Sequence, residues 1–300
     1  MPKEISTAFA LTAQNGLLPA PQFLAMKIPL EDTYADILSK ARRGLGLDLD
    51  TLSAKAGVPS ALANQILSGS FDEPGVRALA AVLNLHPDRV AAIGRTDYRP
   101  AEIPLMDGLS QFNTPFEDMT VNAYLLWDPA ARKAVAFDTG ADCDDMLEAI
   151  DAHGLKLELI LLTHSHGDHI LELDRLRERT GAEAWIGEKE PVAGARSFTV
   201  GKTFQVGALS IESRSTWGHS PGGVTYVVRG LPRTIAIVGD AIFAGSMGGG
   251  GVSYKDALKT NRESILSLPD ETVLCPGHGP LTTVGEQKKV NPFFPDLGKE

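Results

Sequence analysis

The sequence predicts an α/β domain preceded by a small all-α domain, and the spacing of apolar residues along the chain supports both parts. From about residue 99 onward, apolar stretches of strand length alternate with amphipathic stretches of helical length, which is typical of layered α/β architectures. Residues 31–98 instead place apolar side chains at helical spacing and are punctuated by glycines. Residues 1–30 are apolar, contain prolines and lack a clear period. The predicted organisation is therefore an extension over 1–30, a helical domain over 31–98 and an α/β domain over 99–300.

The individual elements follow from apolar periodicity and from the turn residues between them. In the helical domain, apolar residues share a helix face in four groups, namely Ile37, Leu38 and Ala41; Leu52 and Ala56; Leu62 and Ile66; and Leu79, Ala80 and Leu83. In the α/β domain, turn signals bound apolar strands at Val121–Trp127, Lys133–Asp138, Leu157–Thr163, Leu209–Ser215, Val224–Arg229, Thr234–Val238 and Thr272–Cys275. The strand Leu157–Thr163 is expected to be buried on both faces. Helices are expected at Asp144–Ala152, Asp168–Glu178 and Lys255–Leu266.

Composition excludes several classes of protein. The 300 residues (32.0 kDa) are 43% hydrophobic and 22% charged, which excludes a disordered, collagen-like or coiled-coil protein. No apolar run approaches the ~20 residues of a membrane helix, so no membrane partner is expected. The net charge of −10 disfavours general affinity for nucleic acid. Cys143 and Cys275 lie far apart in a chain without a signal peptide, so we expect free thiols and a cytoplasmic protein.

The main chemical signal is a histidine cluster in the sequence Thr-His-Ser-His-Gly-Asp-His at 163–169. It places His164, His166, Asp168 and His169 where a predicted buried strand ends and a helix begins, which is where α/β folds place their sites. Imidazole and carboxylate groups together suit Zn²⁺, Fe²⁺ or Mn²⁺. The alternative interpretation is a solvated polar loop. Four ligands in so short a loop cannot all reach one ion with good geometry, so two ions would share them.

Three later loops offer further ligands, each after a predicted strand. They contain His219 in Gly-His-Ser-Pro-Gly, Asp240 in Val-Gly-Asp and His278 in Gly-His-Gly-Pro. A single histidine in a glycine-rich turn is often structural or merely solvated. Together, however, these residues complete two coordination shells. His86 and His153 are assigned no role.

These motifs, together with Gly-Asp-Ala-Ile-Phe-Ala-Gly-Ser at 239–246 and the segment 277–293, resemble the metallo-β-lactamase superfamily, and most closely its glyoxalase II-like (hydroxyacylglutathione hydrolase) branch. The resemblance runs from about Asn122 to Phe294 and implies an αββα sandwich with two metal ions at one edge of the sheets. It implies Zn²⁺ first, with Fe²⁺ or Mn²⁺ as alternatives. Residue by residue, it implies His164, His166 and His219 for one metal, Asp168, His169 and His278 for the other, and Asp240 as the bridging ligand.

Asp138, in Phe-Asp-Thr-Gly, matches a turn residue of the same family. It is a candidate to orient a ligand histidine from the second shell, and the alternative is a simple turn aspartate.

The sequence departs from the family pattern in two places. Related enzymes usually carry Gly-Arg-x-Asp-Phe after the Gly-Ser, whereas residues 246–252 here read Ser-Met-Gly-Gly-Gly-Gly-Val, without the arginine and the aspartate. The glycine run is either a substrate loop or a wide turn. The chain also ends at Glu300, without the C-terminal helical domain that holds glutathione in the longer enzymes of this branch.

The helical domain resembles a phage-repressor-type helix-turn-helix, from Leu45 through Gly57 to Ala80. Its second helix, at 59–68, contains no lysine or arginine, so DNA is not a favoured partner. We expect this domain to pack on the hydrolase domain or on a second chain in a homodimer.

The predicted function is therefore a binuclear metal-dependent hydrolase acting on a small-molecule thioester or related acyl substrate, with a metal-bridging hydroxide as nucleophile. Alternatives are a lactonase, an iron persulfide dioxygenase and, from another class, a transcription regulator whose metal domain senses a ligand. A true β-lactamase is disfavoured, because those enzymes lack an equivalent bridging aspartate.

Overall fold

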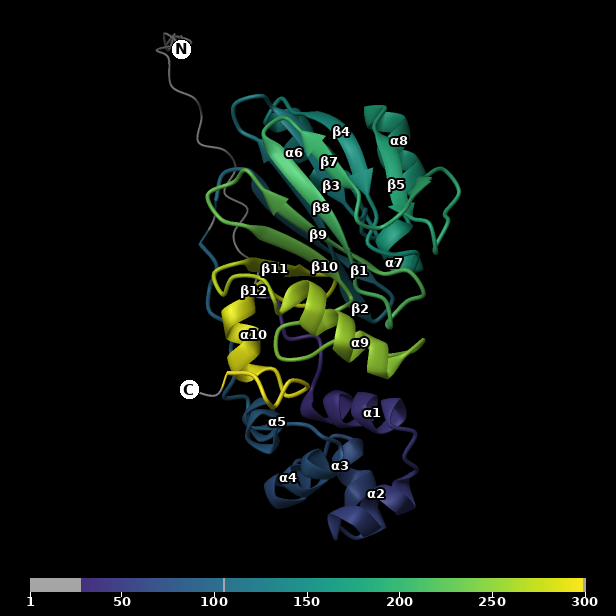
Figure 1. Cartoon of the computed structure of the whole chain (residues 1–300), viewed down its shortest axis with the longest axis vertical. Helices are drawn as coiled ribbons and strands as arrows, with labels where there is room; N and C mark the ends of the chain where they lie inside the picture. The colour runs from purple at the N-terminus through teal and green to yellow at the C-terminus, as the bar shows by residue number, and fades with distance from the viewer. Residues whose placement is uncertain (1–27, 105, 299–300) are drawn as a thin grey trace, which may run out of the picture.

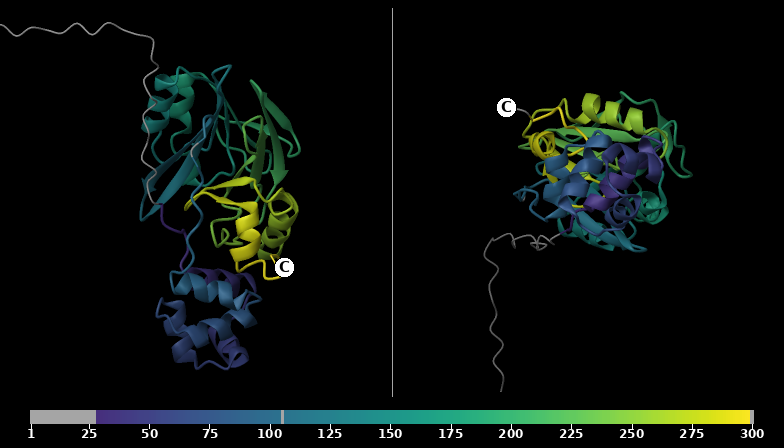
Figure 2. Two further views of the ribbon diagram at one scale, coloured as in Figure 1. Left: turned by 90° about the vertical axis from the view of Figure 1, so that its left-hand side faces the viewer. Right: turned by 90° about the horizontal axis from the view of Figure 1, so that it is seen from below.

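A computed structural model describes residues 28–104 and 106–298, so most of the predicted extension over 1–30 lies outside the described residues. A helical region at 34–94 lies at one end of a larger part that contains two β-sheets (Figures 1 and 2). None of the described helices is long and apolar enough to cross a membrane.

The larger part is a sandwich of two six-stranded sheets. The first sheet contains, in spatial order, β1 (Leu109–Phe116), β2 (Met119–Asp128), β3 (Lys133–Phe137), β4 (Lys156–Leu161), β5 (Glu183–Gly187) and β6 (Arg196–Phe198). The second contains β12 (Thr282–Thr283), β11 (Val273–Pro276), β10 (Ile235–Gly239), β9 (Val224–Arg229), β8 (Leu209–Ser215) and β7 (Thr203–Val206). The helices of this part are α6 (Asp144–Ala152), α7 (Gly167–Ile170), α8 (Leu173–Thr180), α9 (Tyr254–Thr260) with a π-helical turn at Asn261–Ile265, and α10 (Val284–Val290).

Three apolar clusters show that the layers are stacked as αββα, as expected. Between the sheets, Leu126 and Phe137 of the first pack with Tyr226 and Ile237 of the second. On the outer face of the first sheet, α6 and α8 bury side chains such as Met146 and Leu176. On the outer face of the second sheet, α9 and α10 pack against β9, β10 and β11. The fold class that the sequence predicts is therefore confirmed.

Strand direction brings the carboxyl ends of four strands to one edge of the sandwich. Strands β3 and β4 are parallel, with Phe137 opposite Leu161. In the second sheet, β10 and β11 are parallel, with Gly239 opposite Pro276. The residues that follow these strand ends therefore meet at a common edge, which is where open α/β sheets bind their ligands.

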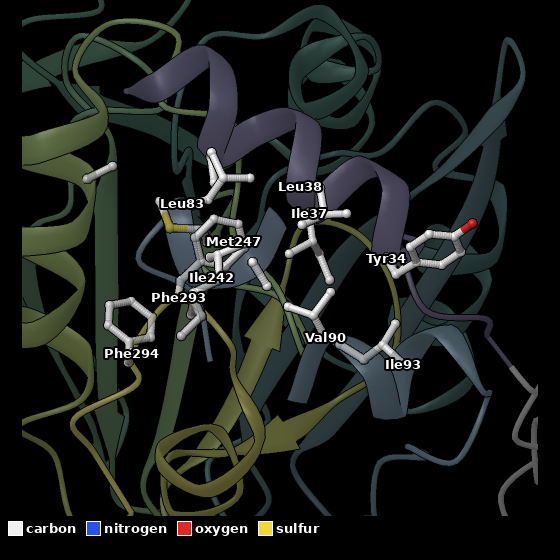
Figure 3. Packing of buried hydrophobic residues seen from close by; sticks show 14 of the residues in the cluster. Tyr34, Ile37, Leu38, Leu83, Val90, Ile93, Ile242, Met247, Phe293 and Phe294 are labelled. Atoms are coloured by element: carbon white, nitrogen blue, oxygen red, sulfur yellow. The ribbon is translucent and has the colours of Figure 1, made fainter. Parts of the chain in front are cut away.

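The helical region contains α1 (Tyr34–Gly44), α2 (Leu49–Ala56), α3 (Ser60–Leu67), α4 (Glu73–Val82) and α5 (Pro87–Gly94). Its core is continuous with that of the sandwich, because Ile37, Leu38 and Val90 belong to the same buried cluster as Ile242 and Phe293 (Figure 3). Polar contacts reinforce this packing, since the Arg89 guanidinium donates to the carbonyl oxygens of Asn291 (2.9 Å), Phe294 (3.0 Å) and Leu297 (2.7 Å). The five helices are therefore attached to the second sheet's side of the sandwich.

Three predicted elements need correction. The single helix expected at Asp168–Glu178 is broken into α7 and α8, because the His169 carbonyl accepts hydrogen bonds from the N–H and hydroxyl of Thr139. The helix expected at Lys255–Leu266 changes from α to π at Asn261, whose buried side-chain amide donates to Ala241 O at 2.6 Å. The strand expected at Leu157–Thr163 is observed as β4, but it is not buried on both faces as expected, because Glu158 and Leu159 are only half-buried. Strands β1, β5, β6, β7 and β12 and helices α5 and α10 were not predicted individually.

Candidate metal centre

All seven residues that the sequence singles out as metal ligands converge at the edge where the four strands end. They form two groups whose ligand atoms lie within 4.8 Å of one another, the first consisting of His164, His166, His219 and Asp240 and the second of Asp168, His169 and His278. In the first group, His164 and His166 lie in the loop after β4, His219 lies in the loop after β8, and Asp240 follows β10. These are the same groups that the family resemblance implies.

In the first group, the histidine nitrogens face one another at short range. His166 Nδ1 lies 3.0 Å from His164 Nε2 and 3.1 Å from His219 Nε2. His219 Nε2 also lies 3.4 Å from Asp240 Oδ2. His164 is buried, whereas His166 is exposed, so the group opens to solvent on one side.

Asp240 connects the first group to the second. Its Oδ1 lies 3.4 Å from His169 Nε2, and its Oδ2 lies 3.4 Å from His278 Nε2. Asp168 Oδ2 is 3.3 Å from the same nitrogen of His278 and 3.5 Å from His169 Nε2. A single carboxylate therefore faces ligand atoms of both groups, as expected of a bridging ligand.

Four of the five histidines have their other ring nitrogen engaged by an orienting group. His278 Nδ1 bonds to Thr120 O (2.7 Å), and His219 Nδ1 bonds to Gly249 O (3.1 Å). These carbonyl partners require a proton on Nδ1, so Nε2 is the nitrogen that would bind a cation at the centre. His164 Nδ1 lies 3.0 Å from the Thr163 hydroxyl, and His169 Nδ1 lies 2.8 Å from Asp138 Oδ2.

Asp138 contacts a ligand histidine and the loop that carries two others. Besides His169, its carboxylate accepts the backbone N–H of Thr163 at 2.7 Å and the Thr163 hydroxyl at 2.8 Å. It is buried, and its φ of 56° is the left-handed conformation that aspartate tolerates better than most residues. Asp138 is thus more than a turn residue, because it holds the orientation of His169 and the start of the 163–169 loop.

The chemistry of the donor set fits divalent cations. His169 Nε2 and Asp240 Oδ1 are buried without a hydrogen-bond partner among the described residues, which is costly unless a ligand engages them. Burial is the largest single influence and lowers the pKa of His169 and of His278. The surrounding carboxylates, Asp240 with Asp138 for His169 and Asp240 with Asp168 for His278, together exceed it and raise these pKa values to about 10 and about 11. The buried carboxylates therefore create a negative potential that a cation would neutralise.

Sequence reasoning missed Glu190, which joins two ligand-bearing loops. Its buried carboxylate accepts the N–H of Ser165 at 2.7 Å and that of Gly222 at 2.6 Å. Ser165 lies between two ligand histidines, and Gly222 follows His219 in the next ligand loop. No local motif marks such a residue, because its partners are backbone groups far away in the sequence.

The glycine run after Ser246 has a steric role. A Cβ at Gly248 would collide with Asp240 O and approach His219 Nδ1 to 2.9 Å. Only a residue without a side chain lets this loop pass directly over the ligands. Gly249 additionally supplies the carbonyl that orients His219.

A cavity of about 300 Å³ opens over both ligand groups. Apart from ligand side chains, Phe116, Met119, Phe243 and the glycines at 248 and 249 line it. Glu31 and Lys40, from the segment before α1 and from α1 itself, complete the lining. The volume suits a small organic ligand.

Comparisons with known proteins find relatives that match about 60% of this chain. The chain is 26% identical over 198 residues to the hydroxyacylglutathione hydrolase GloC of Haemophilus influenzae, covering 58% of this chain and 92% of that protein. The crystal structure of BLEG-1, named a B3 metallo-beta-lactamase, is 28% identical with a TM-score of 0.54, covering 62% of this chain and 99% of that one. The structure of TTHA1623 in a di-iron-bound form is 26% identical with a TM-score of 0.50, covering 61% and 99%.

The family comparison covers most of the sandwich and leaves α1–α5 outside it, so the helix-turn-helix stays a prediction. The model of the metallo-beta-lactamase superfamily matches residues 117–278, which is just over half of the chain and includes every ligand candidate. The chain therefore belongs to the metallo-beta-lactamase superfamily.

Proposed function

We propose that the protein is a binuclear metal-dependent hydrolase that cleaves thioester or related activated acyl bonds. The observation that carries this proposal is the position of Asp240, whose two oxygens each lie 3.4 Å from a histidine nitrogen of the second group, while Oδ2 also faces His219. His164, His166 and His219 would hold one cation, Asp168, His169 and His278 the other, and Asp240 both. The di-iron form of TTHA1623 shows that a chain of similar fold can hold two metal ions.

Bound divalent cations supply Lewis acidity toward an acyl carbonyl and lower the pKa of bound water toward neutrality. The protein's own residues supply position and environment. The carboxylates of Asp168 and Asp240 offset the cationic charge, and the orienting contacts of the histidines fix the ligand atoms before substrate arrives. Phe116, Met119 and Phe243 provide apolar walls that would pack against an acyl chain and exclude bulk water.

The thioester preference is supported by the similarity to GloC over nearly the whole length of that hydrolase. The similarity to BLEG-1 makes β-lactams the necessary comparison. The proposed location of the enzyme is the cytoplasm, since Cys143 and Cys275 are both free thiols.

An activity screen of the full chain reconstituted separately with Zn²⁺, Fe²⁺ and Mn²⁺ tests the proposal. The substrates are S-lactoylglutathione, simpler acyl thioesters, lactones, nitrocefin and glutathione persulfide. We expect the highest kcat/KM on a thioester, although S-lactoylglutathione is expected to be a poor one because the Arg-x-Asp element is absent. A higher kcat/KM on nitrocefin or on a lactone, or stoichiometric oxygen consumption with the persulfide, would replace the thioesterase assignment.

A further inference from the structure

One wall of the cavity over the ligand groups comes from the helical region. Glu31 precedes α1 and Lys40 lies within it, yet both line the same cavity as His166, Asp168 and Asp240. The segment before α1 lies against the His278 loop, since a Cβ at Gly279 would come within 3.2 Å of Glu31 N. The helical region therefore reaches the site directly and is not only a neighbour of the sandwich.

The Lys40 ammonium is held in a defined position at this wall. It donates to Asp32 Oδ2 at 2.5 Å and to Met247 O at 3.0 Å, and its side chain is only 14% exposed. Its nitrogen also lies 5.1 Å from the centroid of the Phe243 ring, within the range of a cation–π contact. The Phe243 ring in turn lies 5.8 Å, centroid to centroid, from the ring of His278. The cation is thus one aromatic ring away from the proposed metal ligands.

Both hydrogen-bond partners of Lys40, Asp32 and Met247 O, involve residues 246–252, the stretch that departs from the family pattern. The Ser246 hydroxyl donates to Asp32 Oδ2 at 2.5 Å, and Met247 supplies the carbonyl that Lys40 binds. This stretch, Ser-Met-Gly-Gly-Gly-Gly-Val at 246–252, contains no charged residue of its own. Charged groups reach it from Lys40 of α1 and from Asp32, which precedes α1.

We propose that Lys40 binds a carboxylate of the substrate, so that the helical region restricts the enzyme to acyl thioesters bearing such a group. An ammonium has three protons, of which Asp32 and Met247 O engage two, and Lys40 lines the cavity. A charge-assisted hydrogen bond to a carboxylate is the strongest use of the third. The preference among thioester substrates rests on the proposed thioesterase function, whereas binding of a carboxylate by Lys40 does not.

Glu31 acts against this attraction, because it lines the same cavity and carries an acidic group that interacts electrostatically with Lys40. The two residues therefore make opposite predictions. Removing the charge of Lys40 weakens binding of a carboxylate-bearing ligand, and removing the charge of Glu31 strengthens it.

The test uses three thioesters that differ by a single carboxylate. The neutral substrate is the pentanoyl thioester of N-acetylcysteamine. The pentanoyl thioester of N-acetylcysteine adds the carboxylate on the thiol side, and the glutaryl thioester of N-acetylcysteamine adds it on the acyl side. Full-length wild type, Lys40→Met, Lys40→Arg, Glu31→Gln and Lys55→Met are compared after reconstitution with Zn²⁺. Lys55 lies on α2, away from the cavity, and serves as the matched control.

For the wild type, we expect at least one carboxylate-bearing thioester to exceed the neutral one in kcat/KM. Lys40→Met should lower that kcat/KM about tenfold, mainly through KM, with little change on the neutral substrate. Lys40→Arg should restore much of the preference, Glu31→Gln should increase it, and Lys55→Met should not change it. The carboxylate-bearing thioester whose kcat/KM falls in Lys40→Met identifies the side of the substrate, thiol or acyl, that Lys40 contacts.

Two further experiments distinguish loss of carboxylate binding from misfolding of the variant and from loss of catalytic turnover. Because Lys40→Met leaves Asp32 without its cation, the double variant Lys40→Met/Asp32→Asn is included to remove both charges together. Calorimetric titration of N-acetylcysteine and of N-acetylcysteamine into the same proteins reports binding without hydrolysis. If no thioester is cleaved but N-acetylcysteine binding still depends on Lys40, the proposed function fails and the carboxylate site stands. Equal losses on neutral and carboxylate-bearing ligands would overturn the carboxylate site.

Discussion

The carboxylate of Glu190 accepts the backbone N–H of Ser165 at 2.7 Å, although 25 positions separate the two residues. Its second oxygen accepts the N–H of Gly222 at 2.6 Å. One buried side chain thereby sets the spacing between the loop of His164 and His166 and the loop of His219. Charge-assisted hydrogen bonds of this kind are short and strong, so Glu190 pre-positions the first ligand group without touching it.

Substituting Glu190→Gln should weaken metal binding at the first group by about 10- to 100-fold. The amide keeps the shape of the side chain but can accept at only one of its two terminal atoms, so either Ser165 or Gly222 loses its partner. Competition against a chelator of known Zn²⁺ affinity measures the effect.

The matched control for this prediction is Glu188→Gln. Glu188 is exposed two positions earlier and bonds to the Thr199 hydroxyl at 2.8 Å, away from the ligand loops. Its Zn²⁺ affinity should equal that of the wild type. If Glu190→Gln binds Zn²⁺ as tightly as Glu188→Gln does, Glu190 only stabilises the fold.

The purified protein should hold up to two transition-metal ions per chain, and Asp240→Ala should lower the occupancy of both. The reason is that Asp240 faces ligand nitrogens of both groups at 3.4 Å. His278→Ala should affect mainly one ion, and His153→Ala, at the end of α6, neither. Elemental analysis after reconstitution gives the stoichiometry. Absence of bound metal in the wild type after exposure to Zn²⁺, Fe²⁺ and Mn²⁺ would refute the metal centre.

The elements that could be predicted accurately from the sequence are those with a clear apolar pattern. The strands expected at Leu209–Ser215 and Val224–Arg229 are observed with the same bounds, and so is the helix Asp144–Ala152. Strand β1 escaped prediction because its pattern is mixed: Phe112 and Thr114 are buried, but Pro115 and Asn113 are unusual in strands. The break between α7 and α8 depends on Thr139, a distant residue that captures the His169 carbonyl.

The ligand candidates could be found from the sequence because they are chemically distinctive and follow strand ends. The structure places all seven of them together. Glu190 and Lys40 could not be found this way. Each contacts backbone groups of loops far away in the sequence, and a glutamate or lysine has many ordinary surface roles. Their positions become apparent only when the three-dimensional packing is known.

Substituting Arg89→Met should lower the free energy of unfolding by about 2–4 kcal/mol, because three carbonyl oxygens lose a charged donor. These carbonyls belong to the segment after α10, so the substitution also weakens the attachment of α5 to the sandwich. Urea denaturation followed by circular dichroism measures the change. The exposed Arg43 on α1 is the control, and Arg43→Met should stay within about 0.5 kcal/mol of the wild type.

The helical region should not bind DNA with useful affinity. The exposed side chains of α3 include Ser60, Asn64 and Gln65, and the helix contains no lysine or arginine that could contact phosphates. Three arginines of this region are already engaged: Arg77 and Arg95 both pair with Glu73, while Arg89 is bound to the C-terminal segment. Fluorescence anisotropy with random duplexes at physiological salt should therefore show no saturation below about 10 µM, within the range of non-specific binding. Selection of a duplex that binds with a Kd near 10 nM, a typical specific affinity, would instead identify a regulator.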